Sequence, residues 1–477
     1  MTSTATRALF APPRAMPRSR GTVVSAVSSV PKGTTPPAHL ESAWTQRVIT
    51  LDPKSRGIFI WTDTLRASLP EMRDVRVGMV NLFLRSATGA LTVNENCDPD
   101  VRTDMQNALE AIVPLGLDEE RAALVGCSID LPVHDGRLAL GTWQGLYLLA
   151  SNAGPVEVVA TLVDQRGDTK TTKNVRLNAP SRGCHPARDA IDAAFAGVFD
   201  GDDDKKNNAA TQNAKSSDSG ASLLNVLVKH TSASLTVNDA NDERVSLAIE
   251  SALNKLVPES WNYPGGAVTF RHTDEGDDDM PAHVKSTLVG ASLTVPVDLG
   301  GHACVGEAPT RGVLLCEHRS GGGFGGSGAT RDAVVTRVRC RKAYQVALAM
   351  DAGDECVDVT ERLRDVVREA SRTMDSESGV ANGLVNVFVR HGSSGAFVVV
   401  GSSRPTFGTS FVNALDDAVR ETESSHREKV KASLASASAT LPVSDGKLAL
   451  GDDQAVFFCE HGTGGETREI VVTVCGD

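Results

Sequence analysis

Aromatic residues are scarce in this chain of 477 residues, at 4% of the sequence. The hydrophobic cores must therefore rely on Val, Leu, Ile and Ala, which favours β-sheet with short helices. No run of about 18 apolar residues occurs, which excludes a membrane-spanning helix. Because the formal net charge is -12 and no basic patch is evident, the sequence also argues against a nucleic-acid or anionic-membrane surface.

The chain has no C-x-x-C pair. Its nine cysteines, an odd number, lie far apart in the sequence. This spacing is not that of a cysteine metal site or of a small disulfide-rich domain. We therefore expect reduced and mostly buried thiols.

Acidic residues are absent from the first 40 positions, which carry five basic residues and many Ser and Thr. This composition predicts an organellar transit peptide over residues 1–42, with a disordered tail as the alternative. The abundance of Ser, Thr, Pro and Val, without a clear basic amphipathic helix, favours the chloroplast over the mitochondrion. A tail without targeting function would leave the protein in the cytoplasm.

One pattern recurs three times along the chain. The segments VNLFLRS from Val80, LNVLVKH from Leu224 and VNVFVRH from Val385 align without gaps. A second landmark follows each of them, as DLPVHDG from Asp130 and TLPVSDG from Thr440 illustrate. Such self-similarity indicates three tandem copies of one domain.

The copies are predicted at residues 43–165, 172–338 and 339–477. Each is predicted to contain period-2 strands and an amphipathic helix, whose apolar face in copy 1 runs from Val101 to Ile112. Copy 2 contains an acidic, low-complexity stretch at 200–220, which we interpret as a solvated loop. Copy 3 is the most degenerate.

Copy 2 alone carries an extra segment, WNYPGGAVTFRHTDEGDDDMPAHVKS from Trp261. It brings His272, Glu275 and His283 into the copy that also holds His230. Three imidazoles with a nearby glutamate suffice for an open catalytic metal site, so His230, His272 and His283 are candidate ligands. The alternative is that His230 caps a strand and the other side chains are solvated. The acidic run at 277–279 is typical of a solvated face.

The sequence resembles the YjbQ family, also called the secondary thiamine-phosphate synthase family. The resemblance rests on HTSASLTVND from His230, RHTDEGDDDMPAHVKS from Arg271, LTVNENCDPDV from Leu91 and GRLALGTWQGLYL from Gly136. It implies an α+β fold with a mixed β-sheet, a homotrimer, a metal or phosphate site at the histidines and a weak thiamine-phosphate synthase activity. That reaction joins a hydroxymethylpyrimidine diphosphate to a thiazole phosphate and releases pyrophosphate.

The resemblance also implies roles for individual side chains. His230, His272, Glu275 and His283 would be ligands or acid-base groups. Substrate would be bound by a larger set: Thr231, Ser232, Asn94, Glu95, Asn96, Trp143, Gln144, Arg271 and Lys285. The cofactor would be a divalent ion, zinc or magnesium, and the substrate a phosphate ester or diphosphate. Arg271 and Lys285 could neutralise a diphosphate leaving group, or they could be ordinary surface charges.

No copy keeps the whole pattern. Copy 1 has Ser86 where copy 2 has His230, and copy 2 has the segment 307–309 where copy 1 has Thr-Trp-Gln. Copy 3 keeps His391 and Gln454. We interpret these complementary losses as a fused pseudo-trimer, monomeric in solution, with one composite site between copies 1 and 2. A metal-dependent hydrolase and a non-catalytic scaffold or ligand-binding pseudoenzyme are the alternatives.

Overall fold

The computed structural model describes residues 44–166, 171–194, 222–297, 311–320, 329–340, 342–351, 356–374, 380–390, 396–420, 422–461 and 467–476. The predicted transit peptide or tail at 1–42, the loop at 200–220, the segment 307–309 and His391 lie outside these residues. No helix in the described ranges is long and apolar enough to cross a membrane.

Copy 1 folds into two antiparallel sheets with helices. Its elements are β1 (Trp44–Leu51), β2 (Gly57–Ile60), α1 (Thr62–Ser68), a 3-10 helix (Pro70–Asp74), β3 (Val77–Leu84), β4 (Ala90–Glu95), α2 (Pro99–Ile112), α3 (Asp118–Val125), β5 (Ser128–His134), β6 (Arg137–Leu138), β7 (Gln144–Ala150) and β8 (Val156–Asp164). The larger sheet has the strand order β1-β8-β3-β5-β6, and the smaller sheet has the order β2-β7-β4.

Copy 2 repeats this plan. Its elements are β9 (Thr172–Ala179), β10 (Gly183–Pro186), α4 (Arg188–Ala194), β11 (Ser222–Val228), β12 (Ala233–Asp239), α5 (Glu243–Leu256), a 3-10 helix (Glu259–Asn262), α6 (Asp279–Val289), β13 (Ser292–Val297), β14 (Arg311–Glu317) and β15 (Ala329–Arg339). The sheet orders are β13-β11-β15-β9 and β10-β14-β12.

Copy 3 repeats the plan again. Its elements are β16 (Lys342–Asp351), β17 (Cys356–Asp358), α7 (Thr360–Thr373), β18 (Asn382–Val389), β19 (Phe397–Ser402), α8 (Phe407–Ala418), α9 (Ser424–Leu434), β20 (Ser438–Ser444), β21 (Lys447–Leu448), β22 (Gln454–Cys459) and β23 (Thr467–Gly476). The sheet orders are β16-β23-β18-β20-β21 and β17-β22-β19. The α+β class and the threefold repeat are therefore confirmed.

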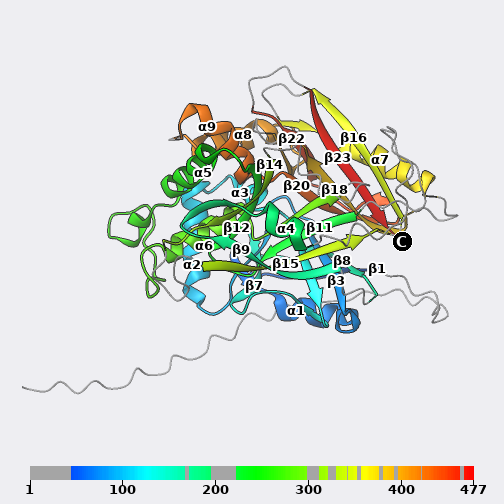
Figure 1. The fold of residues 1–477 in the computed structure, drawn as a ribbon, viewed down its shortest axis with the longest axis horizontal. Helices are drawn as coiled ribbons and strands as arrows, with labels where there is room; N and C mark the ends of the chain where they lie inside the picture. Colours follow the sequence, from blue (N-terminus) through cyan, green and yellow to red (C-terminus); the bar gives the residue numbers. More distant parts are fainter. Residues whose placement is uncertain are drawn as a thin grey trace, which may run out of the picture.

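The amphipathic helices predicted in copies 1 and 2 are α2 and α5. Asp98 caps α2 by accepting a hydrogen bond from the Asp100 amide, and Asp242 caps α5 by accepting one from Arg244. The predicted apolar faces of both helices are buried in one hydrophobic core. Helices α2, α5, α6 and α9 lie on one side of the molecule, opposite most strands of the larger sheets (Figure 1).

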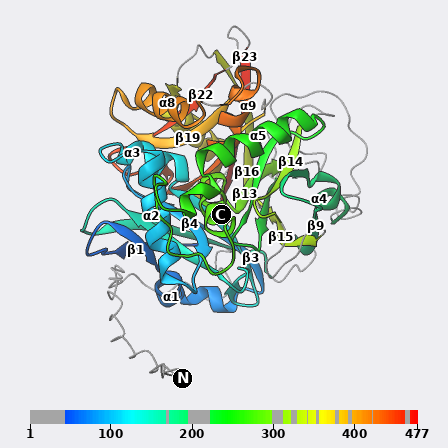
Figure 2. The same cartoon turned by 90° about the vertical axis from the view of Figure 1, so that its left-hand side faces the viewer.

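The three copies lie around a common centre (Figure 2). The asparagine at the second position of each repeated segment explains part of this arrangement. Each donates from Nδ2 to a backbone carbonyl of another copy. The pairs are Asn81 with Thr440, Asn225 with Asp130, and Asn386 with Thr294. Copy 1 thus reaches copy 3, copy 2 reaches copy 1, and copy 3 reaches copy 2. These three contacts link the copies in a cycle.

The cysteines differ from the prediction of reduced thiols throughout. Cys340 is bonded to Cys475, and Cys356 is bonded to Cys459. Free thiols are found at Cys97, which is exposed, and at the buried positions 127, 184 and 316. The prediction was wrong because it rested on spacing along the chain, whereas strand pairing places Cys356 directly opposite Cys459.

Candidate metal centre between copies 1 and 2

Copy 1 meets copy 2 where the end of β4 packs against α6. Asn94 holds this contact and is fully buried. Its Nδ2 donates to the backbone carbonyl of His283, 2.9 Å away, and to the hydroxyl of Thr287, 2.8 Å away. Because a buried amide left unpaired would be costly, these bonds fix the position of α6 relative to β4. Asn94 therefore has a positioning role.

Three side chains that can bind a metal gather at this contact. Glu95 ends β4, His283 lies on α6, and His272 lies in the extra segment that precedes α6. Their ligand atoms all lie within 4.8 Å of one another. Within the described residues, this is the one group of three or more His, Cys, Asp or Glu side chains close enough to share an ion. The cluster takes its carboxylate from copy 1 and its imidazoles from copy 2.

Each imidazole is oriented through its Nδ1 atom. His283 Nδ1 lies 2.9 Å from Asn94 Oδ1, and His272 Nδ1 lies 2.6 Å from Asp98 Oδ2. Both partner oxygens are acceptors, because Asn94 uses its Nδ2 as a donor elsewhere and Asp98 is a carboxylate. A proton on each Nδ1 therefore leaves both Nε2 atoms directed into the cluster. Metal-binding histidines are usually oriented in this way.

Asp279 is the first residue of α6 and contacts both imidazoles of the cluster. Its Oδ2 lies 2.8 Å from His272 Nε2 and 3.3 Å from His283 Nε2. The hydrogen bond to Asp279 raises the pKa of His272 to about 9. Burial lowers the pKa of His283, but Asp279 and Glu95 outweigh it and raise this pKa to about 9. Without another cation, both rings are imidazolium at neutral pH.

The donor set fits a divalent metal ion. Two imidazole nitrogens with carboxylate oxygens are ligands that zinc accepts, whereas magnesium prefers oxygen ligands alone. An ion of charge +2 would take the place of the two Nε2 protons of His272 and His283, so the net charge of the cluster would not change. Of the two predicted ions, the residues favour zinc.

His230 does not belong to the cluster, contrary to the prediction that three histidines share the ion. Its Nδ1 accepts a hydrogen bond from the Ser232 amide at 3.2 Å and lies 3.0 Å from the Ser232 hydroxyl. Burial, with Arg331 next in importance, lowers the pKa of His230 to about 3, so the ring is neutral. Thr231 contributes its backbone carbonyl, 3.3 Å from His283 Nδ1. His230 is thus a neutral neighbour of the cluster.

Glu275 is also absent from the cluster. Its side chain is half exposed, and its Oε2 lies 3.3 Å from Arg319 Nη1. The same Arg319 nitrogen lies 2.6 Å from Asp279 Oδ1 and so holds the outer oxygen of that carboxylate. Glu95 takes the part predicted for Glu275, because residue spacing within a loop does not determine where its side chains lie.

Of the two predicted phosphate-binding cations, only Arg271 is accessible. Its guanidinium is largely exposed and lies 3.9 Å from Asp100. Lys285 is fully buried and donates to Asn254 Oδ1 at 2.6 Å, on the α5 side of α6. Burial lowers the pKa of Lys285 to about 8. This lysine therefore joins two helices within copy 2 and does not reach the cluster.

The remaining predicted residues of copy 1 surround the contact. Asn96 is exposed and donates from Nδ2 to the carbonyl of Gln144. Gln144 is buried and donates from Nε2 to the carbonyls of Val228 and His230, each 3.0 Å away. Its amide is therefore used to join the copies and is not available to a substrate. Trp143 is 59% exposed and remains free to contact one.

The sequence comparison matched residues 307–309 of copy 2 with Thr-Trp-Gln of copy 1. The strand register shows that this match is wrong for Gln144. Glu95 pairs with Gln144, and Asp239 pairs with Arg311. Arg311 is therefore the counterpart of Gln144 in copy 2. It has the same structural role, because its Nη1 donates to the carbonyl of Val389 in copy 3 at 2.5 Å.

Two carboxylates of the centre were not predicted from the sequence. Asp279 was grouped with a solvated acidic run, yet its side chain is 3% exposed. Its position four residues before His283 on one helix is the signal that could have identified it. Asp98 has two contacts, since one of its carboxylate oxygens caps α2 and the other accepts from His272 Nδ1.

The other two boundaries carry different side chains, and the asparagine contact recurs between copies 2 and 3. At copies 2 and 3, Asn238 donates to the Lys429 carbonyl and to Ser433, and Lys429 Nζ lies 3.8 Å from Asp239. At copies 3 and 1, Arg404 pairs with Glu119 at 2.9 Å and Glu120 at 2.8 Å. Ion pairs therefore occupy the positions of the histidine cluster.

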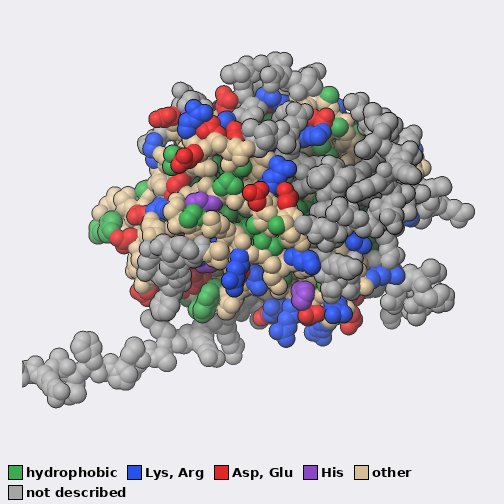
Figure 3. Space-filling view, viewed as in Figure 1, with side chains coloured by type: hydrophobic (Ala, Val, Ile, Leu, Met, Phe, Trp, Pro, Cys, Tyr) green, Lys and Arg blue, Asp and Glu red, His purple; other side chains and the backbone are tan. Residues whose placement is uncertain are grey.

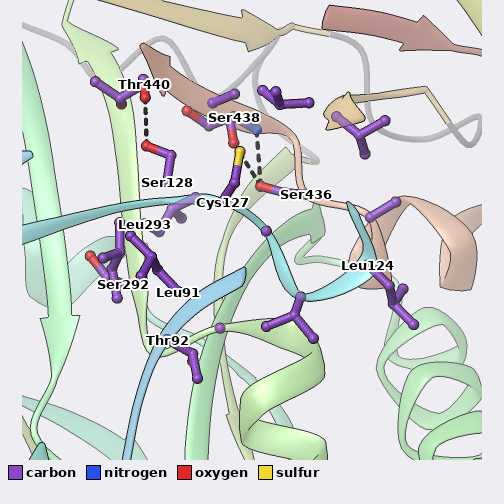
Figure 4. Close-up of a pocket in the computed structure, with 18 of the residues that line it drawn as sticks. Leu91, Thr92, Leu124, Cys127, Ser128, Ser292, Leu293, Ser436, Ser438 and Thr440 are labelled. Carbon is purple, nitrogen blue, oxygen red and sulfur yellow. Dashed lines mark hydrogen bonds between the residues drawn. The ribbon is translucent and has the colours of Figure 1, made fainter. Parts of the chain in front are cut away.

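A pocket where all three copies meet is less suited to chemistry. Figure 4 shows Leu91 and Cys127 of copy 1, Ser292 of copy 2 and Ser438 of copy 3 among its lining residues. Its serine hydroxyls are already used, as Ser438 donates to the Thr294 carbonyl. Burial raises the pKa of the Cys127 thiol to about 12. On the face seen in Figure 3, acidic and basic side chains are interspersed.

The family of UPF0047 YjbQ-like proteins matches the chain at residues 47–164, 207–339 and 344–477. The UPF0047 protein YjbQ of Escherichia coli O157:H7 is 37% identical over 134 residues, which cover 25% of this chain and 97% of that protein. A UPF0047 protein of Synechocystis is 30% identical over 117 residues, covering 22% of this chain and 79% of that protein. A solved structure from C. acetobutylicum has 27% sequence identity and a TM-score of 0.24, covering 25% of this chain and 99% of that chain.

Proposed function

Since the chain belongs to the family of UPF0047 YjbQ-like proteins, we propose that it is a metal-dependent enzyme with one site, between copies 1 and 2, that acts on a phosphorylated small molecule. The observation that carries the proposal is the Glu95, His272 and His283 cluster with both Nε2 atoms directed inward. A divalent ion bound there would neutralise charge on a phosphate oxygen. One site per chain follows from the ion pairs at the other two boundaries.

The surrounding residues support chemistry on an anion. Neutral His230, with its Nδ1 accepting from Ser232, keeps a proton on Nε2 that it can donate without carrying charge. Arg319 holds Asp279, so this carboxylate is positioned before substrate arrives. Exposed Arg271 lies at the edge, where it can meet a phosphate, and exposed Trp143 can cover a flat ring.

The finer proposal is a thiamine-phosphate synthase-like transfer, in which a diphosphate leaves a pyrimidine methylene and the thiazole nitrogen takes its place. The assay is pyrophosphate release by the full chain loaded with zinc, from hydroxymethylpyrimidine diphosphate and thiazole phosphate. We expect His283→Ala to abolish release and Lys429→Ala, its counterpart at the next boundary, to leave it unchanged. Equal release by the two variants would contradict the proposed site.

A metal-dependent hydrolase is the second candidate. It is favoured by Glu95, a cluster carboxylate that keeps some exposure and can accept a proton from water. Phosphate release from a panel of phosphate esters, with the same two variants, separates hydrolysis from transfer. No turnover in either assay, with no zinc in the purified protein, would instead favour a scaffold.

We further propose that the chain closes its own ring. The cyclic asparagine contacts join each copy to the next within one molecule. Light scattering after size exclusion is expected to give a mass near 50.2 kDa. A stable trimer of whole chains would contradict this proposal without affecting the metal centre.

A further inference from the structure

Two cysteines of copy 2 face each other across a pair of strands and have no part in the candidate metal centre. Cys184 on β10 lies directly opposite Cys316 on β14. Their Sγ atoms are 2.8 Å apart, and both side chains are buried. Sulfur atoms that are adjacent in this way need little backbone movement to bond.

The repeat places another cysteine pair at the same position. In copy 3, Cys356 on β17 lies opposite Cys459 on β22, and these two are bonded. The second cysteine of each pair lies in a similar segment, VLLCEH from Val313 in copy 2 and VFFCEH from Val456 in copy 3. Copy 1 has apolar residues there, Ile58 opposite Leu149. The backbone geometry that accommodates a disulfide in copy 3 is therefore also present in copy 2.

Strand β10 provides the route by which a reagent reaches the pair. It has four residues and, among the described strands, lies at the edge of its sheet and pairs with β14 alone. Short edge strands open at low free-energy cost, and opening exposes Cys184. The contact with Cys316, together with burial, raises the pKa of Cys184, so reaction in the closed state is slow.

We propose that Cys184 and Cys316 are a redox-active dithiol, an oxidative modification site that forms a reversible disulfide. The oxidant is a disulfide of low molecular weight, such as glutathione disulfide. One thiolate attacks it, and a glutathione thiol leaves. The second thiolate then attacks the mixed disulfide, and a second glutathione thiol leaves. Two protein thiols are oxidised, and one glutathione disulfide is reduced to two thiols.

A disulfide between Cys184 and Cys316 would link β10 covalently to β14. The residue Arg182, which precedes β10, contacts both α5 and the segment after β14. Arg182, two residues before Cys184, pairs with Glu250 of α5 and donates to the Ser320 hydroxyl. Ser320 follows Arg319, the residue that holds Asp279. Fixing β10 on β14 therefore also fixes Arg182 against the end of β14. This inference is independent of the proposed metal.

The first experiment maps thiols in the full chain. The protein is equilibrated in glutathione buffers of increasing oxidising power, alkylated, digested and analysed by mass spectrometry. We expect Cys184 and Cys316 to change together from alkylated thiols to a disulfide-linked peptide. Addition of dithiothreitol should restore both alkylated thiols. Buried Cys127 is the internal control and stays alkylatable after unfolding. Alkylation of Cys184 and Cys316 at every buffer ratio would overturn the proposal.

The second experiment uses a variant that should fold, Cys184→Val with Cys316→Val, because copy 1 carries apolar residues at both positions. Oxidation is expected to raise the melting temperature of the natural chain by at least about 3 °C, since the bond closes a long loop. The variant should lack that part of the shift. An equal shift in both proteins would assign it to the other cysteines and overturn the proposal.

Discussion

The boundary between copies 1 and 2 and the boundary between copies 2 and 3 share a backbone contact but not a chemistry. In both, a buried asparagine at the end of a strand donates to a helix carbonyl, from Asn94 to His283 and from Asn238 to Lys429. The first has Glu95 beside imidazoles, and the second has Asp239 beside a lysine ammonium. A lysine ammonium is a hydrogen-bond donor without an acceptor lone pair, so it is not a metal ligand. Divergence has kept the asparagine that joins the copies and altered the side chains beside it.

The largest expected effect comes from removing the carboxylate of Glu95, the cluster side chain that copy 1 supplies. We expect Glu95→Gln to weaken zinc binding by at least about 100-fold, because an anionic ligand becomes a neutral amide. Asp239→Asn, the same change at the next boundary, should alter zinc affinity less than about twofold. Competition with a chelating dye measures both. Similar affinities for the two variants would show that copy 1 gives no ligand.

The asparagines test whether the shared contact also serves the centre. Asn94→Ala leaves His283 Nδ1 without its partner, so zinc affinity should fall about 10-fold to 100-fold. Asn238→Ala removes an equivalent packing bond and should lower stability by a similar amount, about 1–3 kcal/mol, without changing zinc affinity. Thermal unfolding and zinc competition on both variants separate the two effects. Loss of affinity in Asn238→Ala would contradict a local role.

Much of this arrangement could be predicted from the sequence, because repeats and helix faces are periodic. The two landmarks, each repeated three times, locate the copies, and the extra segment identifies copy 2 as the copy that carries the histidines. The partners of the histidines could not be assigned in this way. Asp98 meets His272, and Glu95 meets His283, only because copy 1 packs against copy 2. Contacts between copies leave no periodic trace in the sequence.

Errors of assignment have the same physical origin. Lys285 and His283 are two residues apart on α6, so their side chains point to opposite sides of the helix. His283 enters the centre, whereas Lys285 faces α5. The cysteines were misjudged because pairing across strands, as between Cys356 and Cys459, joins residues distant in the chain.

The ion pair between copies 3 and 1 is expected to contribute more to folding stability than the one between copies 2 and 3. Arg404 pairs with Glu120, whose side chain is 2% exposed. Arg404→Ala would leave this buried carboxylate without its cation, so we expect a loss of about 2 kcal/mol. Lys429→Ala should cost less than about 1 kcal/mol, since Asp239 is more exposed and lies 3.8 Å away. Melting temperatures of the two variants test this order, and the reverse order would contradict it.

The smallest expected effect concerns the pocket where the three copies meet, where copies 2 and 3 have Thr294 and Thr440 and copy 1 has Asp130. Asp130 is buried, accepts from Asn81 Nδ2 at 2.8 Å, and has its pKa raised by burial. A raised pKa means that folding takes up a proton, so stability is greatest below the unfolded value of about 4 and declines as pH rises through the folded pKa.

Asp130→Thr removes that decline. Threonine can still accept from Asn81, as Thr294 accepts from Asn225 Nδ2 at 2.9 Å. We expect the variant and the natural chain to melt at similar temperatures near pH 4, and the variant to melt on the order of 2 °C higher at neutral pH. The measurement is a series of melts across this pH range. If the difference in melting temperature between the two proteins did not grow with pH, ionisation of the buried Asp130 would cost no stability. This result would contradict the prediction.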